Sequence, residues 1–477
     1  MKKFYGKALS VFLLVTFLLT GCGVAVSEQS EPSPSTTAQS GEAATSGQTA
    51  KIEKYGVELK NLSLDGTLKG QYEGQTLTIP VMSGDFENSI NAVVPLFEEL
   101  SGADVVVESM PGDQFTDKVQ LDLNNTNRYD IILSPVAFLH GYAEAGKIAE
   151  LQPVIDKNAS PSYDTSDFLE GLYKTYGTYK GKLYALPYKP DVQLLFYRKD
   201  LFEDPKNQTA FKAKFNKDLK VPETNEDMLQ VAEFFTKSFN PDSPVNYGYV
   251  NCMLKGASRW LWINRGADDV DGNLMPAFNN EKGLKAFDTI VELQKYAPKE
   301  WLQMGWDEGN AFFANGNAAM IEQWPGLWVT VNDDKSPVKD KVGVAVTPGK
   351  TPTLGGWGIG INAESKNQEL AWKFIEFATS KDGELLKIEY TMDPCRKSTY
   401  EIKGVQDFSP LYGALMESFN YAATLADADV PYISSKLNDS MEGHVQLVLT
   451  GGETTQQAVD RMQKEFMAEL QKAKLIK

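Results

Sequence analysis

Residues 181–202 read GKLYALPYKPDVQLLFYRKDLF, and this stretch decides how the chain is divided. Two apolar runs, residues 183–187 and residues 192–197, predict two strands. Between them lies a short polar break, residues 188–191. The charged triplet at residues 198–200 predicts the start of a helix directly after the second strand.

Two prolines set the nature of this break. Pro187 and Pro190 have no N–H to donate to a strand ladder, so a central strand should not continue through them. Such a connection is typical of a chain that leaves one sheet and enters another, where ligand clefts form. Asp191, at the break, is therefore a better site candidate than most surface carboxylates. The alternative is a kinked edge strand beneath a loop.

The first residues predict export. Lys2, Lys3 and Lys7 precede an apolar segment, residues 8–19, that is too short to span a bilayer. It ends in Leu-Thr-Gly-Cys, which resembles the bacterial lipobox. That resemblance implies a signal peptide over residues 1–21 and a lipid on the sulfur of Cys22, with palmitate as an added acyl chain. The alternative is an ordinary secretory signal followed by an incidental cysteine.

Residues 22–73 are expected to be a lipid-anchored flexible tether and lead-in, because residues 23–50 are rich in Ser, Thr, Gly, Glu, Pro and Ala. Removal of the three signal-peptide lysines changes the formal net charge from −17 to −20. Such a negative chain is a poor partner for nucleic acid or for an anionic membrane surface. Two further cysteines, Cys252 and Cys395, are expected to be buried thiols, with a disulfide bridge as the alternative.

Strands and helices alternate after the tether. Strands are predicted at residues 77–82, 105–107 and 130–133. Helices are predicted from Pro95 to a C-cap at Gly102, and over residues 115–123 and 136–145. This order favours a parallel α/β sheet, in which ligands lie at the carboxyl ends of strands. The rim of a cleft is therefore expected at residues 83–87 and 134–138.

The second part of the chain is mostly helical. Helices are predicted over residues 224–239, 258–265, 282–296, 309–317, 370–378 and 459–473, and strands over residues 318–322, 342–346 and 355–362. The Asp271–Gly272–Asn273 sequence lacks the later acidic ligands of a calcium loop, so a plain turn is expected and no metal site. The chain is too long for one small core, so two lobes are expected.

Several stretches together resemble the extracellular solute-binding proteins that serve carbohydrate ABC importers, of the maltodextrin-binding type. They are LTIPVMSGD, FEELSGADVVV, YDIILSPVAFLHGYAEAGKIAEL, GKLYALPYKPDVQLLFYRKDLF, AFFANGNAAMIEQWPGLW, GGWGIGINAESKNQELAWKFIEFATS and HVQLVLTGGETTQQAVDRMQKEF. Their collinearity over nearly the whole chain carries the resemblance.

The resemblance implies an α/β fold with two lobes of the periplasmic-binding-protein type, three inter-lobe crossings and a central ligand cleft. The crossings would lie at residues 187–192, 355–361 and 394–397. The N-terminal lobe would comprise residues 74–190 and 361–393, and the C-terminal lobe residues 191–360 and 394–477.

The resemblance also implies a function. The protein would be a monomeric receptor, tethered through Cys22 to the outer face of the bacterial cell membrane. It would bind a mono- or oligosaccharide between two closing lobes and deliver it to the transmembrane subunits of an ABC permease. No cofactor, metal or catalytic residue is implied.

Ligand-binding positions follow from the matched motifs and from the chemistry of sugars. Carboxylates and hydroxyls can bind sugar hydroxyls, and aromatic rings can stack on sugar C–H faces. The candidates are Asp85, Phe86, Glu87, Asp113, Ser134, Phe138, Asp191, Trp260, Glu322, Trp324, Trp328 and Trp357. For each tryptophan the alternative is core packing. The family's C-terminal stacking tryptophan and arginine map to Asp439 and Gly443, so a maltodextrin is not favoured.

Two other functions share these features. The same fold could present a sugar to a membrane kinase as a sensor. An exported carbohydrate-active enzyme would instead need paired carboxylates. The chain has only His140 and His444 as histidines and no nucleophile motif, which disfavours the enzyme.

Overall fold

The computed structural model describes residues 66–476, except residues 255–256, 272, 274, 391, 408, 422 and 425–433. The expected signal peptide (1–21), the lipidation site Cys22 and the tether up to residue 65 lie outside the described residues. Within the described part, no helix combines the length and the hydrophobicity that a membrane span requires.

The first strands and helices alternate as expected. Strands β1 (Thr76–Met82) and β2 (Asp104–Met110) pair in parallel, with Thr76 opposite Asp104 and Met82 opposite Met110. Helices α3 (Gly112–Asn125) and α4 (Val136–Glu144) flank β3 (Ile131–Pro135). The N–H of Asp130 donates to the Thr78 carbonyl over 2.9 Å, which ties β1 to the start of β3.

Helix α2 (Asp85–Ser101) is longer than expected. It begins at Asp85 and contains Pro95 in its interior, so the prediction that Pro95 opens the helix was wrong. Phe86, Ile90 and Phe97 lie on its buried side, and this apolar burial outweighs the hydrogen bond that Pro95 cannot make. Gly102 ends the helix with φ 76°, as expected for a glycine C-cap.

A second group of strands has mixed direction. Strand β12 (Trp357–Ile361) lies between β3 and β6 (Ala185–Lys189) and is antiparallel to both. The expectation of a wholly parallel first sheet is therefore wrong for β3, because a strand from much later in the chain pairs with it. Strand β6 is an edge strand, which tolerates Pro187. It continues to Lys189, so the break in the chain is at residues 190–193.

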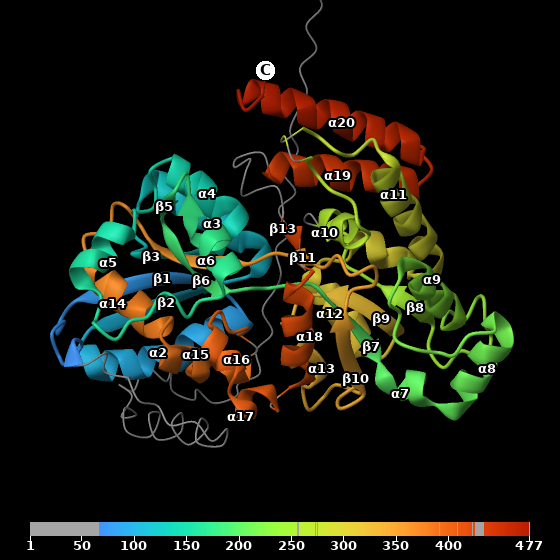
Figure 1. The fold of residues 1–477 in the computed structure, drawn as a ribbon, viewed down its shortest axis with the longest axis horizontal. Helices are drawn as coiled ribbons and strands as arrows, with labels where there is room; N and C mark the ends of the chain where they lie inside the picture. The colour runs from blue at the N-terminus through green and yellow to red at the C-terminus, as the bar shows by residue number, and fades with distance from the viewer. Residues whose placement is uncertain are drawn as a thin grey trace, which may run out of the picture. The chain divides into compact units, whose positions relative to one another are not determined.

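The other large sheet has the order β10–β7–β9–β8. Its strands are β7 (Leu194–Arg198), β8 (Tyr247–Val250), β9 (Ala318–Gln323) and β10 (Val342–Val346). Strand β7 is antiparallel to β9 and β10, whereas β8 and β9 are parallel. Figure 1 shows β1, β2, β3 and β6 in one body of the ribbon and β7 to β10 in another. We call these bodies the N-terminal lobe and the C-terminal lobe.

Helices surround both bodies. The remaining elements are α5 (Gln152–Asn158), α6 (Glu170–Gly177), β4 (Thr178–Tyr179), β5 (Lys182–Leu183), α7 (Lys199–Glu203), α8 (Pro205–Phe215), α9 (Asn225–Phe234), α10 (Ala257–Asn264), α11 (Glu281–Leu293), η2 (Gln294–Tyr296), η3 (Lys299–Gln303), α12 (Trp306–Ala314), α13 (Leu327–Val331), β11 (Thr353–Leu354), α14 (Gln368–Ala378), α15 (Lys381–Lys387), η4 (Ile388–Tyr390), α16 (Lys397–Tyr400), α17 (Lys403–Gln406), α18 (Pro410–Phe419), β13 (Ala423–Thr424), α19 (Ser434–Leu449) and α20 (Thr455–Lys472).

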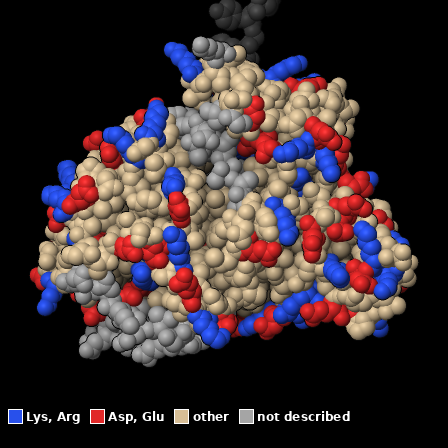
Figure 2. All heavy atoms as spheres, viewed as in Figure 1, with Lys and Arg blue, Asp and Glu red and all other residues tan. Residues whose placement is uncertain are grey.

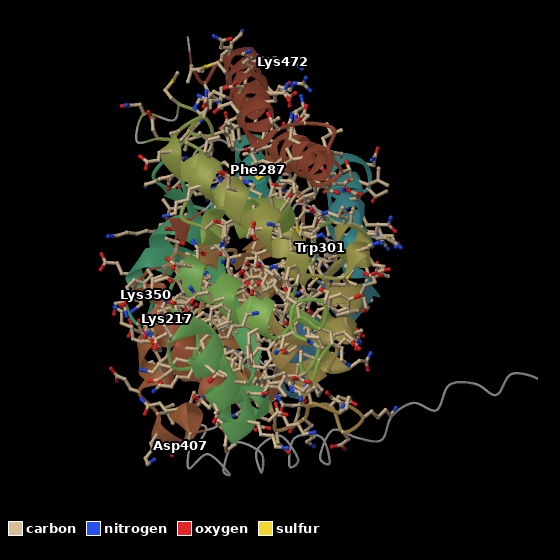
Figure 3. All side chains as sticks on the ribbon, turned by 90° about the vertical axis from the view of Figure 1, so that its right-hand side faces the viewer. Lys217, Phe287, Trp301, Lys350, Asp407 and Lys472 are labelled. Atoms are coloured by element: carbon tan, nitrogen blue, oxygen red, sulfur yellow. The ribbon has the colours of Figure 1, made fainter. Side chains whose placement is uncertain are left out.

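The helical cover of the C-terminal lobe can be followed in Figure 3, where Phe287 on α11 and Trp301 on η3 are labelled. Both side chains are fully buried. Helix α11 packs against α10 and α20, and its apolar face was expected from the spacing of residues 282–296. Figure 2 shows basic and acidic side chains interspersed over the visible face.

Two connections between the lobes form one hydrogen-bonded ribbon. Val192 pairs with Leu354, and the N–H of Gly355 donates to the carbonyl of Asp191 over 2.8 Å. The N–H of Gln193 donates to the Thr353 carbonyl over 2.9 Å. The segment from β6 to β7 and the segment from β11 to β12 are therefore held in register where the chain changes sheets.

A third segment returns towards the C-terminal lobe. The N–H of Leu169 donates to the Cys395 carbonyl over 2.8 Å, and buried Arg396 donates to the carbonyls of Thr379 and Asp164. These contacts attach residues 395–396 to the N-terminal lobe. After α16 and α17 the chain reaches α18, which packs against β7 and β10. Cys395 and Cys252 are both buried free thiols, which confirms that expectation.

Substitution of Gly356 by alanine tests the ribbon. Gly356 has φ 71°, and an added Cβ would lie 2.0 Å from the ring of Tyr176. Backbone strain and overlap should together lower the free energy of unfolding by about 3 kcal/mol or more. Urea unfolding would measure the loss.

Gly413→Ala is the matched control. Gly413 lies within α18 with open space around its Cα, so alanine should raise stability by up to about 1 kcal/mol through helix propensity. Equal effects of the two substitutions would contradict the special role of Gly356.

Candidate functional site

A buried ammonium group lies where the N-terminal lobe meets the first connection. Lys189 Nζ is 2.6 Å from Asp85 Oδ2 and 3.6 Å from Asp191 Oδ1. A third carboxylate, that of Asp393, interacts electrostatically with Lys189, Asp191 and Asp85. We call Asp85, Lys189, Asp191 and Asp393 the carboxylate–lysine cluster. It brings together one predicted pair, Asp85 and Asp191, and two residues that were not predicted.

Local structure places each member. Asp85 is in the first turn of α2, where the helix dipole favours an acidic side chain. Lys189 ends β6, and Asp191 follows in the left-handed region with φ 52°. Asp393 lies in the third segment, after α15. The cluster therefore joins the start of α2 to two of the three segments that connect the lobes.

Burial and charge shift the pKa values of the cluster. Burial raises the pKa of Asp191 to about 6, although Lys189 opposes the shift. Burial alone would lower the pKa of Lys189, but Asp191, Asp85 and Asp393 outweigh it, so the pKa is raised. Burial raises the pKa of Asp393 well above its ordinary value.

Asp393 was missed in the sequence, although it directly precedes Pro394 in an expected crossing. Its side chain is 1% exposed, and neither carboxylate oxygen has a hydrogen-bond partner of normal geometry among the described residues. Burial raises the pKa of Asp393 and outweighs the opposing effects of the Lys189 charge and the Asp191 backbone. The signal that could have identified it is an acid next to a proline, as at Pro190–Asp191.

Three tryptophans form a partly exposed group in the C-terminal lobe. The ring centroids of Trp260 and Trp306 are 4.9 Å apart, and those of Trp260 and Trp324 are 5.2 Å apart. They come from α10, from the start of α12 and from the turn after β9. We call them the indole triad. Trp260 and Trp324 were predicted, whereas Trp306 was not, because nothing in its local sequence marks it.

The triad borders the connecting ribbon. An added Cβ on Gly355 would lie 2.7 Å from the Trp324 ring, so only glycine allows this ring to approach the backbone next to Asp191 so closely. The Trp324 N–H donates to Gln323 Oε1 over 2.9 Å. Gln323 in turn donates to Asn310 on α12 and to the thiol of Cys252. These bonds fix the turn that carries Trp324.

Trp357 and Phe86 pack in the N-terminal lobe. Their centroids are 4.3 Å apart, and Phe115 lies 5.7 Å from Trp357. Phe86 is buried, and Trp357 interacts with Asp191 as a side-chain hydrogen-bond donor that lowers its pKa. Both rings therefore lie next to the carboxylate–lysine cluster.

Other predicted residues lie elsewhere. Glu87 accepts a hydrogen bond from Ser109 over 2.7 Å on the N-terminal lobe surface. Ser134 is buried in β3 opposite Gly358, and Phe138 packs partly buried against the core. Trp328 lies on α13, outside the indole triad. The side chain of Asp113 lies outside the described residues.

Glu322 is buried within the C-terminal lobe. It forms a fully buried ion pair with Arg265 and accepts a hydrogen bond from Tyr249 over 2.8 Å. Both of its oxygens are thus occupied by protein groups. This arrangement gives Glu322 a structural role beneath the site.

Asn264 connects the same network to the ribbon. Its amide donates to Gln193 Oε1 over 2.5 Å, and its Oδ1 accepts from the Thr353 N–H and hydroxyl, each over 2.9 Å. The Thr353 hydroxyl also donates to the Trp260 carbonyl. Asn264 therefore fixes both connecting strands to the helix that carries Trp260.

The lobes also touch next to the cluster. An added Cβ on Gly326 would lie 3.0 Å from Asp85 Oδ2. The carboxylate at the start of α2 thus contacts the turn after β9. A shallow surface hollow between α9 and α11, lined by residues such as Leu229 and Leu284, is a separate feature.

The raised pKa of Asp191 predicts a pH effect on stability. The folded protein binds this proton more tightly than the unfolded chain, so the contribution is present below pH 4 and lost as the pH rises through about 6. The loss should reach about 3 kcal/mol in the wild type and be absent in Asp191→Asn. Urea unfolding of both proteins at pH 4, 5, 6 and 7 measures the difference, and parallel curves would contradict the assignment.

The model of the bacterial extracellular solute-binding protein family matches residues 83–385. A probable ABC transporter-binding protein of Deinococcus radiodurans is 27% identical over 286 residues, which cover 57% of this chain and 66% of that protein. The match thus spans slightly less than two thirds of that relative.

Solved structures share the fold. An ABC transporter solute-binding protein from Agrobacterium radiobacter K84, in complex with ribitol, is 26% identical with a TM-score of 0.69 and covers 83% of this chain and 98% of that one. One from Agrobacterium vitis S4, with bound D-mannitol, is 25% identical with a TM-score of 0.69 and covers 84% and 99%. Because the family model matches well over half of the sequence and the two-lobed fold agrees with it, the chain belongs to the bacterial extracellular solute-binding protein family.

Proposed function

We propose that this chain is the receptor of an ABC importer for a carbohydrate, either a sugar or a sugar alcohol. The ligand binds between the two lobes, at the carboxylate–lysine cluster and the indole triad, and passes unaltered to the transmembrane subunits of the permease. The receptor acts as a monomer without a cofactor or a catalytic step. Membership of a solute-binding family supports transport rather than catalysis.

One observation supports the proposal most directly: a carboxylate residue, Asp191, and an aromatic ring, that of Trp324, both contact the backbone of Gly355. The Asp191 carbonyl accepts from the Gly355 N–H, and the Trp324 ring packs on Gly355. A polyhydroxylated ligand needs both kinds of group, since its hydroxyls donate to carboxylates and its C–H faces pack on indoles. Asp85, Asp191 and Trp324 are therefore the ligand contacts that the geometry favours most.

The relatives support a small polyol or sugar. The two Agrobacterium proteins bind ribitol and D-mannitol, which are open-chain sugar alcohols. In this chain Asp439 and Gly443 map to the positions where maltodextrin binders have a stacking tryptophan and an arginine, so that aromatic surface is absent. A ligand of sugar or sugar-alcohol size would be enclosed by the motion of one lobe against the other about the ribbon at residues 191–193 and 353–355.

The same proposal includes a membrane anchor on Cys22. The lipobox at residues 19–22 and the low-complexity residues that follow support it. A diacylglyceryl group with a further acyl chain holds a protein firmly at a membrane surface. The lobes would then remain near the permease on the outer face of the cell membrane.

Trp324→Ala tests the binding site. In a thermal-shift screen of sugars and sugar alcohols, a ligand at 100 times its Kd should stabilise the wild-type protein by about 2.7 kcal/mol. Loss of the Trp324 ring should weaken that ligand about tenfold or more, because stacking and apolar contact are removed. Isothermal titration calorimetry would measure both dissociation constants.

Trp328→Ala is the matched control, since Trp328 lies on the next helix outside the indole triad. It should leave the Kd within about twofold of the wild-type value. Equal losses in both variants would contradict the assigned site. A wild-type protein that binds none of the sugars and sugar alcohols, or that alters one chemically, would overturn the proposed function.

Cys22→Ala tests the anchor in a bacterial host that processes lipoproteins. The wild-type protein should incorporate radiolabelled palmitate and sediment with membranes, because its only acylated residue would be Cys22. The variant should incorporate no label and appear in the soluble extracytoplasmic fraction. Membrane retention of the unlabelled variant would contradict anchoring through this residue.

A further inference from the structure

The carboxylate–lysine cluster contains more negative than positive charge. Three carboxylates, those of Asp85, Asp191 and Asp393, face one ammonium group, that of Lys189. Lys189 is within 2.6 Å of Asp85 and 3.6 Å of Asp191. One cation therefore balances at most one of the three carboxylates.

Asp393 is the member whose two carboxylate oxygens have no hydrogen bond of normal geometry within the described part of the chain, although the Lys189 charge and the Asp191 backbone act on it. It is 1% exposed. Oδ1 of Asp191 likewise has no hydrogen bond of normal geometry among these residues, and its ion-pair partner Lys189 Nζ lies at the longer distance of 3.6 Å. A buried carboxylate without hydrogen bonds destabilises the folded state, so its presence requires a reason outside ordinary packing.

Other positive groups do not supply these hydrogen bonds. The guanidinium of Arg396, three residues away, donates to the carbonyls of Thr379 and Asp164 and lies 4.1 Å from the centre of the Phe168 ring. Within the described ranges, no group of three or more His, Cys, Asp or Glu residues is arranged to hold a metal ion. The unused acceptors of the cluster thus point to a donor that is brought in from outside.

The cluster is placed to receive such a donor. The Asp85 side chain is 14% exposed and touches the turn at Gly326 in the other lobe. The Asp191 carbonyl accepts a hydrogen bond from the Gly355 N–H, and the Trp324 ring packs on Gly355. The Asp85 carboxylate therefore lies at the contact between the lobes, and the Asp191 backbone lies beside the stacking surface.

We propose that Asp393 is a ligand-binding carboxylate and that the cluster selects polyhydroxylated ligands that present hydrogen-bond donors and carry no anionic group. This inference rests on the proposed function and narrows it to a ligand class. Hydroxyl or ammonium groups would donate hydrogen bonds to Asp393 and to Oδ1 of Asp191, which Lys189 Nζ approaches only to 3.6 Å. A carboxylate or phosphate on the ligand would meet an excess of negative charge, and the single lysine is already occupied.

Two matched series of compounds test the selectivity. The first is sorbitol, 1-amino-1-deoxysorbitol and gluconate, which differ only at one terminal carbon. The second is glucose, glucosamine and glucuronate. Titration calorimetry should show that the amino compound binds at least as tightly as the neutral one. The anionic compound should bind about 100-fold more weakly or not at all.

Asp393→Asn separates ligand contact from a structural role. It should raise the Kd of the neutral compound about tenfold and that of the amino compound more. The ratio of the Kd of the anionic compound to the Kd of the neutral compound should fall about tenfold, because one negative charge is removed. If Asp393 acted only through the fold, all three compounds would weaken by the same factor. That uniform change would overturn the inference.

Asp122→Asn is the control for the loss of a buried carboxylate elsewhere. Asp122 is buried in the N-terminal lobe and accepts hydrogen bonds from Thr126 and from the Arg128 N–H. This variant should be less stable than the wild type but should keep the wild-type order of the three compounds. The Tm of each unliganded variant would be recorded first to confirm that it is folded.

The outcomes distinguish the two proposals. Tight binding of gluconate or glucuronate by the wild-type protein would overturn the ligand class while leaving a carbohydrate receptor in place. A second outcome is that the protein binds none of the six compounds but binds an uncharged oligosaccharide with a Kd that Asp393→Asn leaves unchanged. That result would also overturn the inference about Asp393 while leaving a carbohydrate receptor in place. Lack of binding by every carbohydrate tested would overturn the proposed function itself.

Discussion

The salt bridge between Lys189 and Asp85 is the interaction on which the arrangement of the site depends. It joins the last residue of β6 to the first turn of α2, two elements separated by 104 residues in the chain. Lys189 is almost completely buried, so its charge is tolerated only because carboxylates surround it. The same ammonium group holds Asp191 at the point where the chain leaves the N-terminal lobe.

A second polar network in the C-terminal lobe fixes the other side of the connection. Asn264 binds Gln193 on one connecting strand and Thr353 on the other, and the Arg265–Glu322 pair lies directly beneath. These groups are buried and hydrogen-bonded, so they specify one position for the ribbon and for α10. The few residues of the ribbon between the two networks are therefore where the chain passes from one lobe to the other.

The sequence predicted much of the fold and part of the site. The lengths and periodicities of β1, β2, α3, β9, β10 and α20 are local properties, and each element was found close to its expected range. Pro95 was misread because a proline inside a helix and one at its start look alike in sequence. The buried face of α2, which decides the matter, depends on partners elsewhere. The direction of β12 could not be predicted, since pairing with β3 and β6 is a choice among distant strands.

The sequence by itself determined the alternating α/β elements and the acidic residue at the break after β6, and its first residues predict an export signal with a lipobox. These features follow from hydrophobic spacing and from the geometry of proline, which act between neighbouring residues. Only the tertiary structure decided which carboxylates share Lys189, that Trp306 completes the indole triad and that Glu322 is paired with Arg265. Charge balance and burial are properties of groups brought together from distant parts of the chain, so they exist only once the chain has folded.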